Sequence, residues 1–270
     1  MRFAAAVEYD GSYFHGWQEQ QGELATVQLE IERAFSAVAN ETIKVICAGR
    51  TDAGVHATQQ IIHFDTTAQR PLHSWLFGVN SNLPTTVSVR WIQPVSDEFH
   101  ARFSATSRRY NYYIYNQRIR SALLRRYTSW QCRPLDVELM QQAAQCLVGE
   151  HDFSSFRASQ CQAHSPIRKI DFINLTRQGD IICLDIQANA FLQHMVRNIA
   201  GVLMAIGTGE KPLAWIEDVL HAKARAEGGV TAQPNGLYLV EVNYPSEFNL
   251  PLEVLFPLFR GMFHESFSNS

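Results

Sequence analysis

The sequence predicts an α+β fold in which helices pack on a mixed, largely antiparallel central sheet. Strand-like alternation and helical apolar spacing follow one another twice along the 270 residues, and hairpins replace a regular strand–helix–strand series. The loose duplication, with its joint near residues 98–108, suggests two similar halves that share the sheet. We therefore expect one half at 1–105, a second half at 106–245 and a tail at 246–270.

The first half is expected to contain four strands and two helices. A helix after Thr26, a candidate N-cap, would place Val27, Ile31, Ala34, Phe35 and Val38 on one face. A weaker helix follows Pro71 and reaches Val79. The expected strands are Phe3–Tyr9, Ile43–Cys47, Gln59–Phe64 and Val87–Ile92, and in the third Ile62 and Phe64 alternate with His63 and Asp65.

The second half repeats this order loosely. Its expected strands are Arg109–Tyr115, the hairpin Ile167–Arg177 with Ile181–Gln187, and Gly236–Tyr244. Asp136 is a candidate N-cap for a helix that ends near Gly149, a second helix spans Phe191–Ile206, and a shorter one follows Pro212. The apolar tail at 246–270 is expected to pack on the body or on a second subunit.

Composition indicates a soluble, cytoplasmic protein. Residues are 46% hydrophobic and 18% charged, with a net charge of −3, and no apolar run approaches the roughly 20 residues of a membrane span. The first residues have neither the apolar core nor the cleavage site of a secretory signal. Five cysteines without a C-x-x-C pair argue against a disulfide framework or a zinc knuckle, so we expect reduced thiols.

The average charge conceals a strongly basic segment. Ala101–Leu135 contains eight arginines and no acidic residue, while the rest of the chain has 15 basic against 26 acidic residues. Seven aromatic residues interleave the arginines. Guanidinium groups suit phosphate recognition, and aromatic faces can stack on unpaired bases, so the pattern favours nucleic-acid binding. A solvated basic edge strand with its aromatic residues in the core is the alternative.

Asp52 is the first candidate for chemistry. It lies with Arg50 in the glycine-rich loop 48–54 between two expected strands, where a rigid scaffold can present a reactive group. Taken alone, the loop is more typical of a turn in which an aspartate satisfies its own backbone.

Arg197 and Tyr110 are the other two candidates. Arg197 interrupts an apolar helix, so it either extends to solvent or meets a carboxylate; if it is buried, Asp52 is the candidate partner and the pair would keep Asp52 ionised. Tyr110 follows Arg108 and Arg109 and could stack on a base, move a proton or fill the core. It shares a strand face with Tyr112, whereas Tyr113 and Tyr115 point the other way, and only one set can face the core of a half-buried sheet.

The loop 47–57 resembles the signature of the TruA family of tRNA pseudouridine synthases. Ordered motifs carry this resemblance over about 240 residues. They comprise Glu8–Gly11, Gly16–Gln18, Val27-Gln28, Cys47–Ala57, His63–Asp65, Phe99–Ala105, Arg109-Tyr110, Asp152–Phe156, Ala190–Leu192, His194–Asn198, Gly236–Leu239 and Val242. Departures are small: Gln59 stands where glycine is common in the family, and Asn111 where a basic residue is common.

The resemblance implies an activity and a set of roles. Similar enzymes have the pseudouridine synthase fold, work as homodimers and isomerise uridine to pseudouridine at positions 38, 39 and 40 of the tRNA anticodon stem-loop, without cofactor or metal. By analogy Asp52 is the essential carboxylate, Tyr110 the active-site aromatic residue and Arg197 the ion-pair partner of Asp52. Arg50 would hold the RNA or occupy the space of the displaced base, and Arg108 and Arg109 would bind the substrate. The implied partner is tRNA, not DNA or a membrane.

Two rival interpretations belong to other classes. A non-enzymatic RNA-binding module would use the arginine-rich strand alone, and Asp52 would be a turn residue. A metal hydrolase would use His56, His63 and Asp52, although the two histidines are seven residues apart without the helical spacing of a metal pair.

Overall fold

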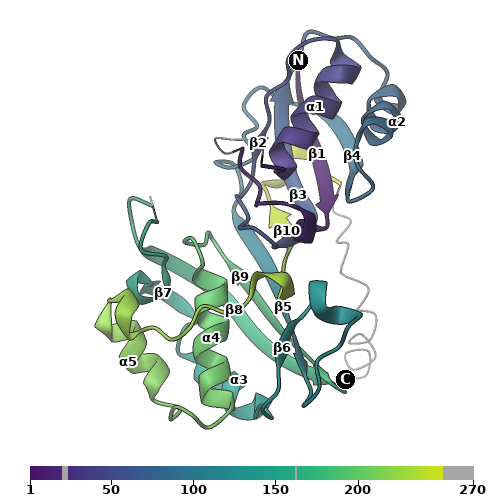
Figure 1. The fold of residues 1–270 in the computed structure, drawn as a ribbon. Helices are drawn as coiled ribbons and strands as arrows, with labels where there is room; N and C mark the ends of the chain where they lie inside the picture. The colour runs from purple at the N-terminus through teal and green to yellow at the C-terminus, as the bar shows by residue number, and fades with distance from the viewer. Residues whose placement is uncertain (20–23, 162, 252–270) are drawn as a thin grey trace, which may run out of the picture. The chain divides into compact units, whose positions relative to one another are not determined.

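Two compact units make up the protein (Figure 1). The computed structural model describes residues 1–19, 24–161 and 163–251. The first unit contains residues 1–106 together with 238–251, and the second is Ser107–Leu237. Among the described strand pairs, β3–β10 and β5–β6 are parallel and most others are antiparallel, so the predicted α+β class with a mixed, largely antiparallel sheet is confirmed.

The strands of the first unit follow the order β4-β1-β3-β10, with β2 paired to β3. Their bounds are β1 (Arg2–Tyr9), β2 (Ile46–Cys47), β3 (His56–Asp65), β4 (Val87–Val95) and β10 (Leu237–Asn243). β10 pairs in parallel with β3, Tyr238 opposite His56. The strand expected at the end of the second half therefore completes the sheet of the first unit.

Two helices, α1 (Val27–Ala39) and α2 (Leu72–Asn82), cover one face of this sheet (Figure 1). Thr26 caps α1 as predicted, because its side chain accepts a hydrogen bond from the Leu29 N–H. Phe35 of α1 packs edge-on against Phe64 of β3 at 4.7 Å between ring centroids, and Trp75 of α2 lies within 6.1 Å of both rings. These aromatic contacts form part of the core of the first unit.

The second face of β3 is also buried, which the alternating pattern did not predict. His63, which alternates with the apolar residues Ile62 and Phe64, is only 3% exposed. Phe99 packs edge-on to its ring, and Phe99 itself contacts Tyr244 and Phe248. Segments from residues 99–101 and 244–248 thus cover the face that a half-buried strand would leave to water.

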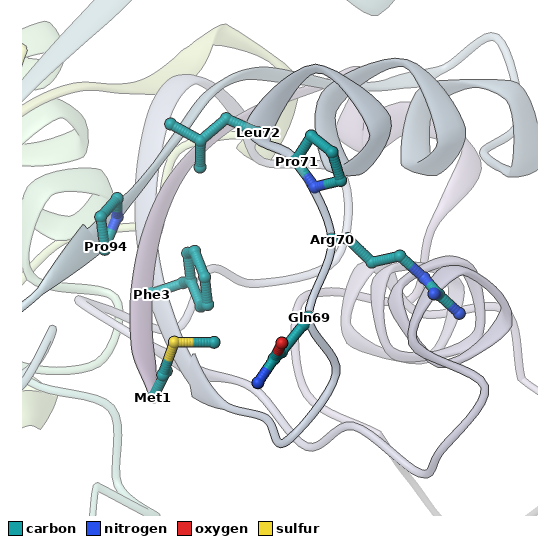
Figure 2. A pocket seen from close by; sticks show the side chains of 7 residues that line it. All are labelled: Met1, Phe3, Gln69, Arg70, Pro71, Leu72 and Pro94. Carbon is teal, nitrogen blue, oxygen red and sulfur yellow. The ribbon is translucent and has the colours of Figure 1, made fainter.

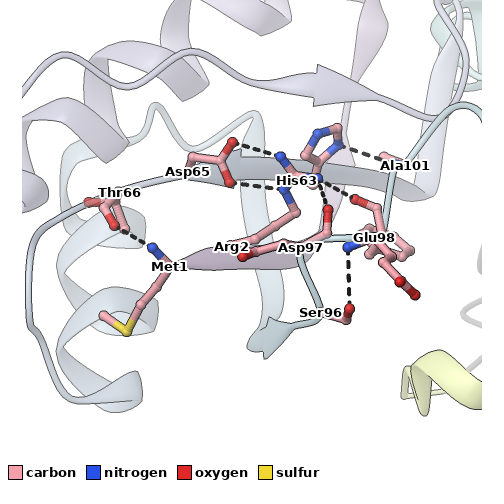
Figure 3. A network of polar contacts seen from close by, with 10 residues as sticks. Met1, Arg2, His63, Asp65, Thr66, Ser96, Asp97, Glu98 and Ala101 are labelled. Atoms are coloured by element: carbon pink, nitrogen blue, oxygen red, sulfur yellow. Dashed lines mark hydrogen bonds and ion pairs between the residues drawn. The ribbon is translucent and has the colours of Figure 1, made fainter.

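His63 is held in its neutral form by this burial. The Ala101 N–H donates to His63 Nδ1 at 3.1 Å, and Arg2 forms a paired hydrogen bond with Asp65 beside it (Figure 3). Removal from water, reinforced by His100 and by the positive charge of Arg2, lowers the pKa of His63 to about 4. A proton on Nδ1 would also eliminate the acceptor that Ala101 uses.

We expect acid to destabilise the wild type more than His63→Asn, whose side-chain oxygen can accept the same N–H. Since the pKa of His63 is lower in the folded than in the unfolded protein, its contribution is present above about pH 6.5 and is lost as pH falls towards 4. Linkage gives a loss of about 2 kcal/mol between pH 7 and pH 5. Denaturant unfolding of both proteins at the two pH values measures this difference, and equal pH dependence would contradict it.

The strands of the second unit follow the order β5-β9-β8-β7, with β6 parallel to β5. Their bounds are β5 (Ser107–Asn116), β6 (Ser129–Gln131), β7 (Gly149–Asp152), β8 (Ile167–Gln178) and β9 (Ile181–Ala188). The predicted β8–β9 hairpin is confirmed. β6 and β7 were not predicted, because three or four residues are too few to show alternation.

Three helices belong to this unit: α3 (Val137–Gln145), α4 (Met195–Gly207) and α5 (Trp215–Ala222). Asp136 caps α3 as predicted. α4 begins four residues later than expected, after His194 in the left-handed region at φ 64°. Within the described ranges, no helix is both long and apolar enough to cross a membrane.

β5 is buried on both faces, contrary to the expectation that only one set of tyrosines would face the core. Tyr110, Tyr112 and Tyr113 are all buried. Phe191 packs edge-on to Tyr110, and the Tyr112 hydroxyl donates to the Gln233 carbonyl, so residues distant in sequence cover the Tyr110 face. Most of the predicted tail, residues 252–270, lies outside the described residues.

Candidate active site

Asp52 lies in a loop whose two ends are fixed by hydrogen bonds. The Ala48 N–H donates to the Ile61 carbonyl, and the Gln60 side-chain amide exchanges hydrogen bonds with both backbone groups of Gly49. The Asp52 carbonyl accepts from the Val55 N–H at 3.1 Å across a tight turn. Asp52 itself is half-buried, and Arg50 is exposed. The loop therefore presents a carboxylate from a fixed backbone.

Thr51 fixes the residue immediately before Asp52. Its hydroxyl forms a 2.8 Å hydrogen bond with the Tyr9 hydroxyl at the end of β1, and its carbonyl accepts from the Trp17 N–H at 3.0 Å. Thr51 is buried, as are Tyr9 and Trp17. The position of Asp52 thus depends on the segment 9–17 as well as on its own loop.

Two glycines allow that segment to approach the loop. A Cβ at Gly11 would lie 1.9 Å from the Val55 carbonyl oxygen. Gly16 has φ +96°, and a Cβ there would lie 3.0 Å from the Thr51 carbonyl oxygen. Sequence reasoning placed Gly11 and Gly16 in family motifs but assigned them no role; nor did it single out Thr51 or Gln60. The sequence signal that could have indicated a close approach was the presence of a glycine near an aromatic residue in the motifs Glu8–Gly11 and Gly16–Gln18.

His56 and His63 lie at opposite ends of β3 and do not form a site together. The ring of His56 stacks on Tyr238 at 4.6 Å, and its Nδ1 accepts from the Gly11 N–H. His63 Nδ1 accepts from Ala101. Across the described part of the chain, no three His, Cys, Asp or Glu side chains are grouped so that they could hold a metal ion. The arrangement thus gives the metal-hydrolase interpretation no ligand set.

Cys47 precedes the loop and is buried at the end of β2. Burial raises the pKa of its thiol to about 12. A thiol with such a pKa stays protonated at neutral pH and is a poor nucleophile. Among the side chains of this motif, the carboxylate is therefore the better candidate for covalent or acid–base chemistry.

Arg108, Arg109 and Tyr110 share the start of β5 in the second unit. Arg109 forms a paired hydrogen bond with Asp185 of β9 at 2.7 and 2.6 Å and lies over the Phe172 ring. Arg108 is buried, and its Nη1 donates to the Asn189 carbonyl at 3.0 Å. Both guanidinium groups thus have contacts inside the unit, and their predicted role in substrate binding stays a prediction.

Arg197 in the first turn of α4 is half-buried. Its Nε donates to the Ala232 carbonyl at 2.9 Å, and the Ala232 N–H donates to the Arg197 carbonyl at 3.1 Å. One turn later, a Cβ at Gly201 would lie 1.9 Å from the Val230 carbonyl oxygen. These contacts hold α4 against residues 230–232 and fix the stem of Arg197. Its predicted pairing with Asp52 would join the two units and stays a prediction.

The described surfaces of the units include two hollows that differ in size and lining. The larger, about 500 Å³, lies at the start of β1 and α2 in the first unit and is mainly apolar (Figure 2). The smaller, about 290 Å³, lies in the second unit beside β5 and β6. Neither is lined by a residue predicted for catalysis, so hollow size alone does not locate the chemistry.

Comparison with known proteins shows which family this chain belongs to. A family model described as tRNA pseudouridine synthase matches residues 5–104 and 143–245. The chain belongs to this family. The matched ranges of this tRNA pseudouridine synthase family include Arg50, Asp52 and Arg197, while residues 105–142, with Arg108, Arg109 and Tyr110, lie between them.

Relatives match over nearly their whole length. The tRNA pseudouridine synthase A of Nitrosococcus oceani is 59% identical over 251 residues, which cover 93% of this chain and 96% of that protein. The proteins of the same name from Coxiella burnetii and Pseudomonas aeruginosa are 57% and 55% identical over 258 residues, 96% of this chain and 98% and 90% of theirs. The resemblance stated from the motifs is confirmed.

Proposed function

We propose that this synthase converts uridine to pseudouridine at positions 38, 39 and 40 of the tRNA anticodon stem-loop. The supporting observation is the 59% identity, across nearly the full length of both chains, to a protein named tRNA pseudouridine synthase A. The proposal includes a homodimer in the cytoplasm and no bound cofactor or metal. It accounts for the basic segment, which supplies positive charge for an RNA backbone.

The proposed reaction is an isomerisation, so no oxidant or reductant is consumed. The C–N bond between uracil and the sugar breaks, the base turns, and a C–C bond forms between uracil C5 and the same sugar carbon. The proton on C5 leaves and N1 gains one. Asp52, as an ionised carboxylate, would attack sugar C1′, attack uracil C6 or remove the 2′ proton; each route is open to a carboxylate.

The surrounding groups have complementary roles in this proposal. Arg50, exposed beside Asp52, would hold the RNA or occupy the space of the displaced base, and Arg197 would pair with Asp52 and keep it ionised. Because the target base is stacked, it must be flipped out at a cost of a few kcal/mol. Tyr110 would line the pocket that receives it. Either Tyr110 or Asp52 would remove the C5 proton.

The decisive experiment measures pseudouridine in an unmodified tRNA transcript with uridines at positions 38–40, with EDTA present. Product at those positions supports the proposed function and its independence from metal. Tight tRNA binding without product across several tRNAs would instead favour a binding module.

Tyr110→Phe separates stacking from proton transfer, because it keeps the ring packed against Phe191 and removes only the hydroxyl. If Tyr110 removes the C5 proton, we expect the single-turnover rate to fall about 10²-fold or more while tRNA affinity is kept. A near-normal rate would exclude an obligatory hydroxyl and leave proton removal to Asp52. Phe191→Leu, which alters the packing partner alone, is the matched control.

A further inference from the structure

The smaller hollow has a polar and aromatic lining that the catalytic proposal does not use. It measures about 290 Å³, and its walls include Tyr115, Arg120, Arg125, Trp130, Gln233 and Asn235. This volume lies near the lower limit for small-molecule sites and suits one nucleotide better than a duplex. Most of the lining comes from residues 115–130, outside the ranges that the family model matches.

Two arginines give the hollow its charge. Arg120 and Arg125 are both exposed. Neither side chain makes a hydrogen bond or ion pair with any residue that the structure describes. No lining residue is acidic. The nearby Asp180 side chain already accepts a hydrogen bond from Gln117. Two guanidinium groups without a carboxylate in the lining are suited to a phosphate, which can accept several of their hydrogen bonds.

Trp130 offers the aromatic surface. It is 46% exposed although its Nε1–H already donates to the Gln117 carbonyl at 2.8 Å, so the ring is held while much of its surface remains open. In the parallel β5–β6 pair, Trp130 lies opposite Tyr115, which places both aromatic side chains in the same wall. An oriented, exposed indole is a platform on which an unpaired base can stack.

Hydrogen bonds and close backbone packing hold the walls of the hollow in place. The Asn235 side-chain amide donates to the carbonyls of Arg125 and Thr128. A Cβ at the next residue, Gly236, would lie 2.5 Å from the Tyr113 carbonyl oxygen. The turn at 234–236 therefore packs directly on β5 and fixes the loop that carries Arg125. A site already held in place loses less entropy when a ligand binds.

We propose that this hollow binds a single unpaired nucleotide of the tRNA substrate, with its phosphate on Arg120 and Arg125 and its base on Trp130. The inference rests on tRNA being the substrate, as proposed above, but assigns the nucleotide to a site separate from the Asp52 loop. Gln233 and Asn235 would face the edge of the base. A free nucleotide has the same chemistry, and the experiment distinguishes the two sources.

The test measures tRNA affinity of the full chain in a double-mutant cycle. We expect Trp130→Ala to weaken binding about tenfold or more, the effect of losing one stacked base. Arg120→Gln should also weaken it and lower the slope of log Kd against log salt by about 0.7, the value for one phosphate contact on a single strand. Because both groups would hold one nucleotide, their effects should be non-additive.

Arg118→Gln is the matched control, since Arg118 is exposed two residues before Arg120 and does not line the hollow. Its effect should add to that of Trp130→Ala. Trp130→Phe keeps a stacking face and should stay within about threefold of wild type, which separates stacking from a folding defect. Additive effects in both cycles, or no effect of Trp130→Ala, would overturn the proposal.

Two further measurements are needed. One distinguishes a tRNA nucleotide from a free nucleotide as the ligand, and the other separates the nucleotide site from the proposed reaction. Uridine monophosphate at 1 mM should not displace the tRNA, because one nucleotide makes few contacts; displacement at micromolar concentration would assign the hollow to a free nucleotide. Pseudouridine formation by the wild type is measured in parallel. Coupled binding effects without product would refute the proposed reaction alone, and product with uncoupled effects would refute the nucleotide site alone.

Discussion

Asp52→Asn is expected to abolish pseudouridine formation and to leave tRNA affinity within about twofold of wild type. The amide has nearly the shape of the carboxylate but cannot act as a nucleophile or a base. Contacts that shape the loop come from Thr51, Gly49 and the backbone carbonyl of Asp52, and the substitution leaves these in place. Loss of such a group costs about 10⁴-fold or more in turnover.

Single-turnover conversion of an unmodified transcript measures the rate, and filter binding measures the affinity. Asp97→Asn is the matched control, because Asp97 is an exposed carboxylate of the same unit and contacts Arg2 through its backbone carbonyl. It should retain the wild-type rate. A rate within tenfold of wild type for Asp52→Asn, or an equal loss of binding and turnover, would remove Asp52 from the chemistry.

Gly11→Ala is expected to lower both turnover and stability. Its new methyl group would lie 1.9 Å from the backbone oxygen of Val55, so either the segment 11–17 or the Asp52 loop must move by more than 1 Å. Misplacement on this scale costs about 10²-fold in turnover. Overpacking against backbone also lowers the free energy of unfolding by about 1–3 kcal/mol.

Single-turnover kinetics and denaturant unfolding measure the two effects separately. Gly179→Ala is the control: Gly179 has φ +56° but no atom within 4 Å of its Cβ position, so only backbone strain of about 1 kcal/mol is added. Gly16→Ala, with its closest contact at 3.0 Å and backbone strain at φ +96°, provides a second variant should Gly11→Ala fail to fold. Normal turnover and stability for Gly11→Ala would contradict the close approach.

Local signals predicted the elements well where a short stretch of sequence decides the structure. The caps Thr26 and Asp136, the apolar face of α1 and the β8–β9 hairpin all depend on neighbouring residues. Alternation in β3 and β5 also showed correctly which residues share a face. It did not show that the other face is covered as well, because the covering residues come from distant segments such as 99–101 and 230–235.

The residues of the candidate site also fall into those that local sequence signals revealed and those that they did not. Asp52 and Arg50 were found because the motif 47–57 is contiguous, and Arg197 because a charge interrupts an apolar helix. The close approach of Gly11 to Val55 and the hydrogen bond between Tyr9 and Thr51 join residues more than 40 positions apart. No spacing rule in a single sequence reveals such contacts, so these supporting residues could be named as motif members but not given a role.

The parallel pairing of β10 with β3 has a consequence for how the protein is made. His56, which follows the Asp52 loop, stacks on Tyr238, and that residue is translated about 180 positions later. At 5–20 residues per second, the strand beside the loop emerges roughly 10 to 40 s after β3. The Asp52 loop therefore lacks one of its neighbouring strands until residues 237–243 have been synthesised, and its surroundings are complete only after that point.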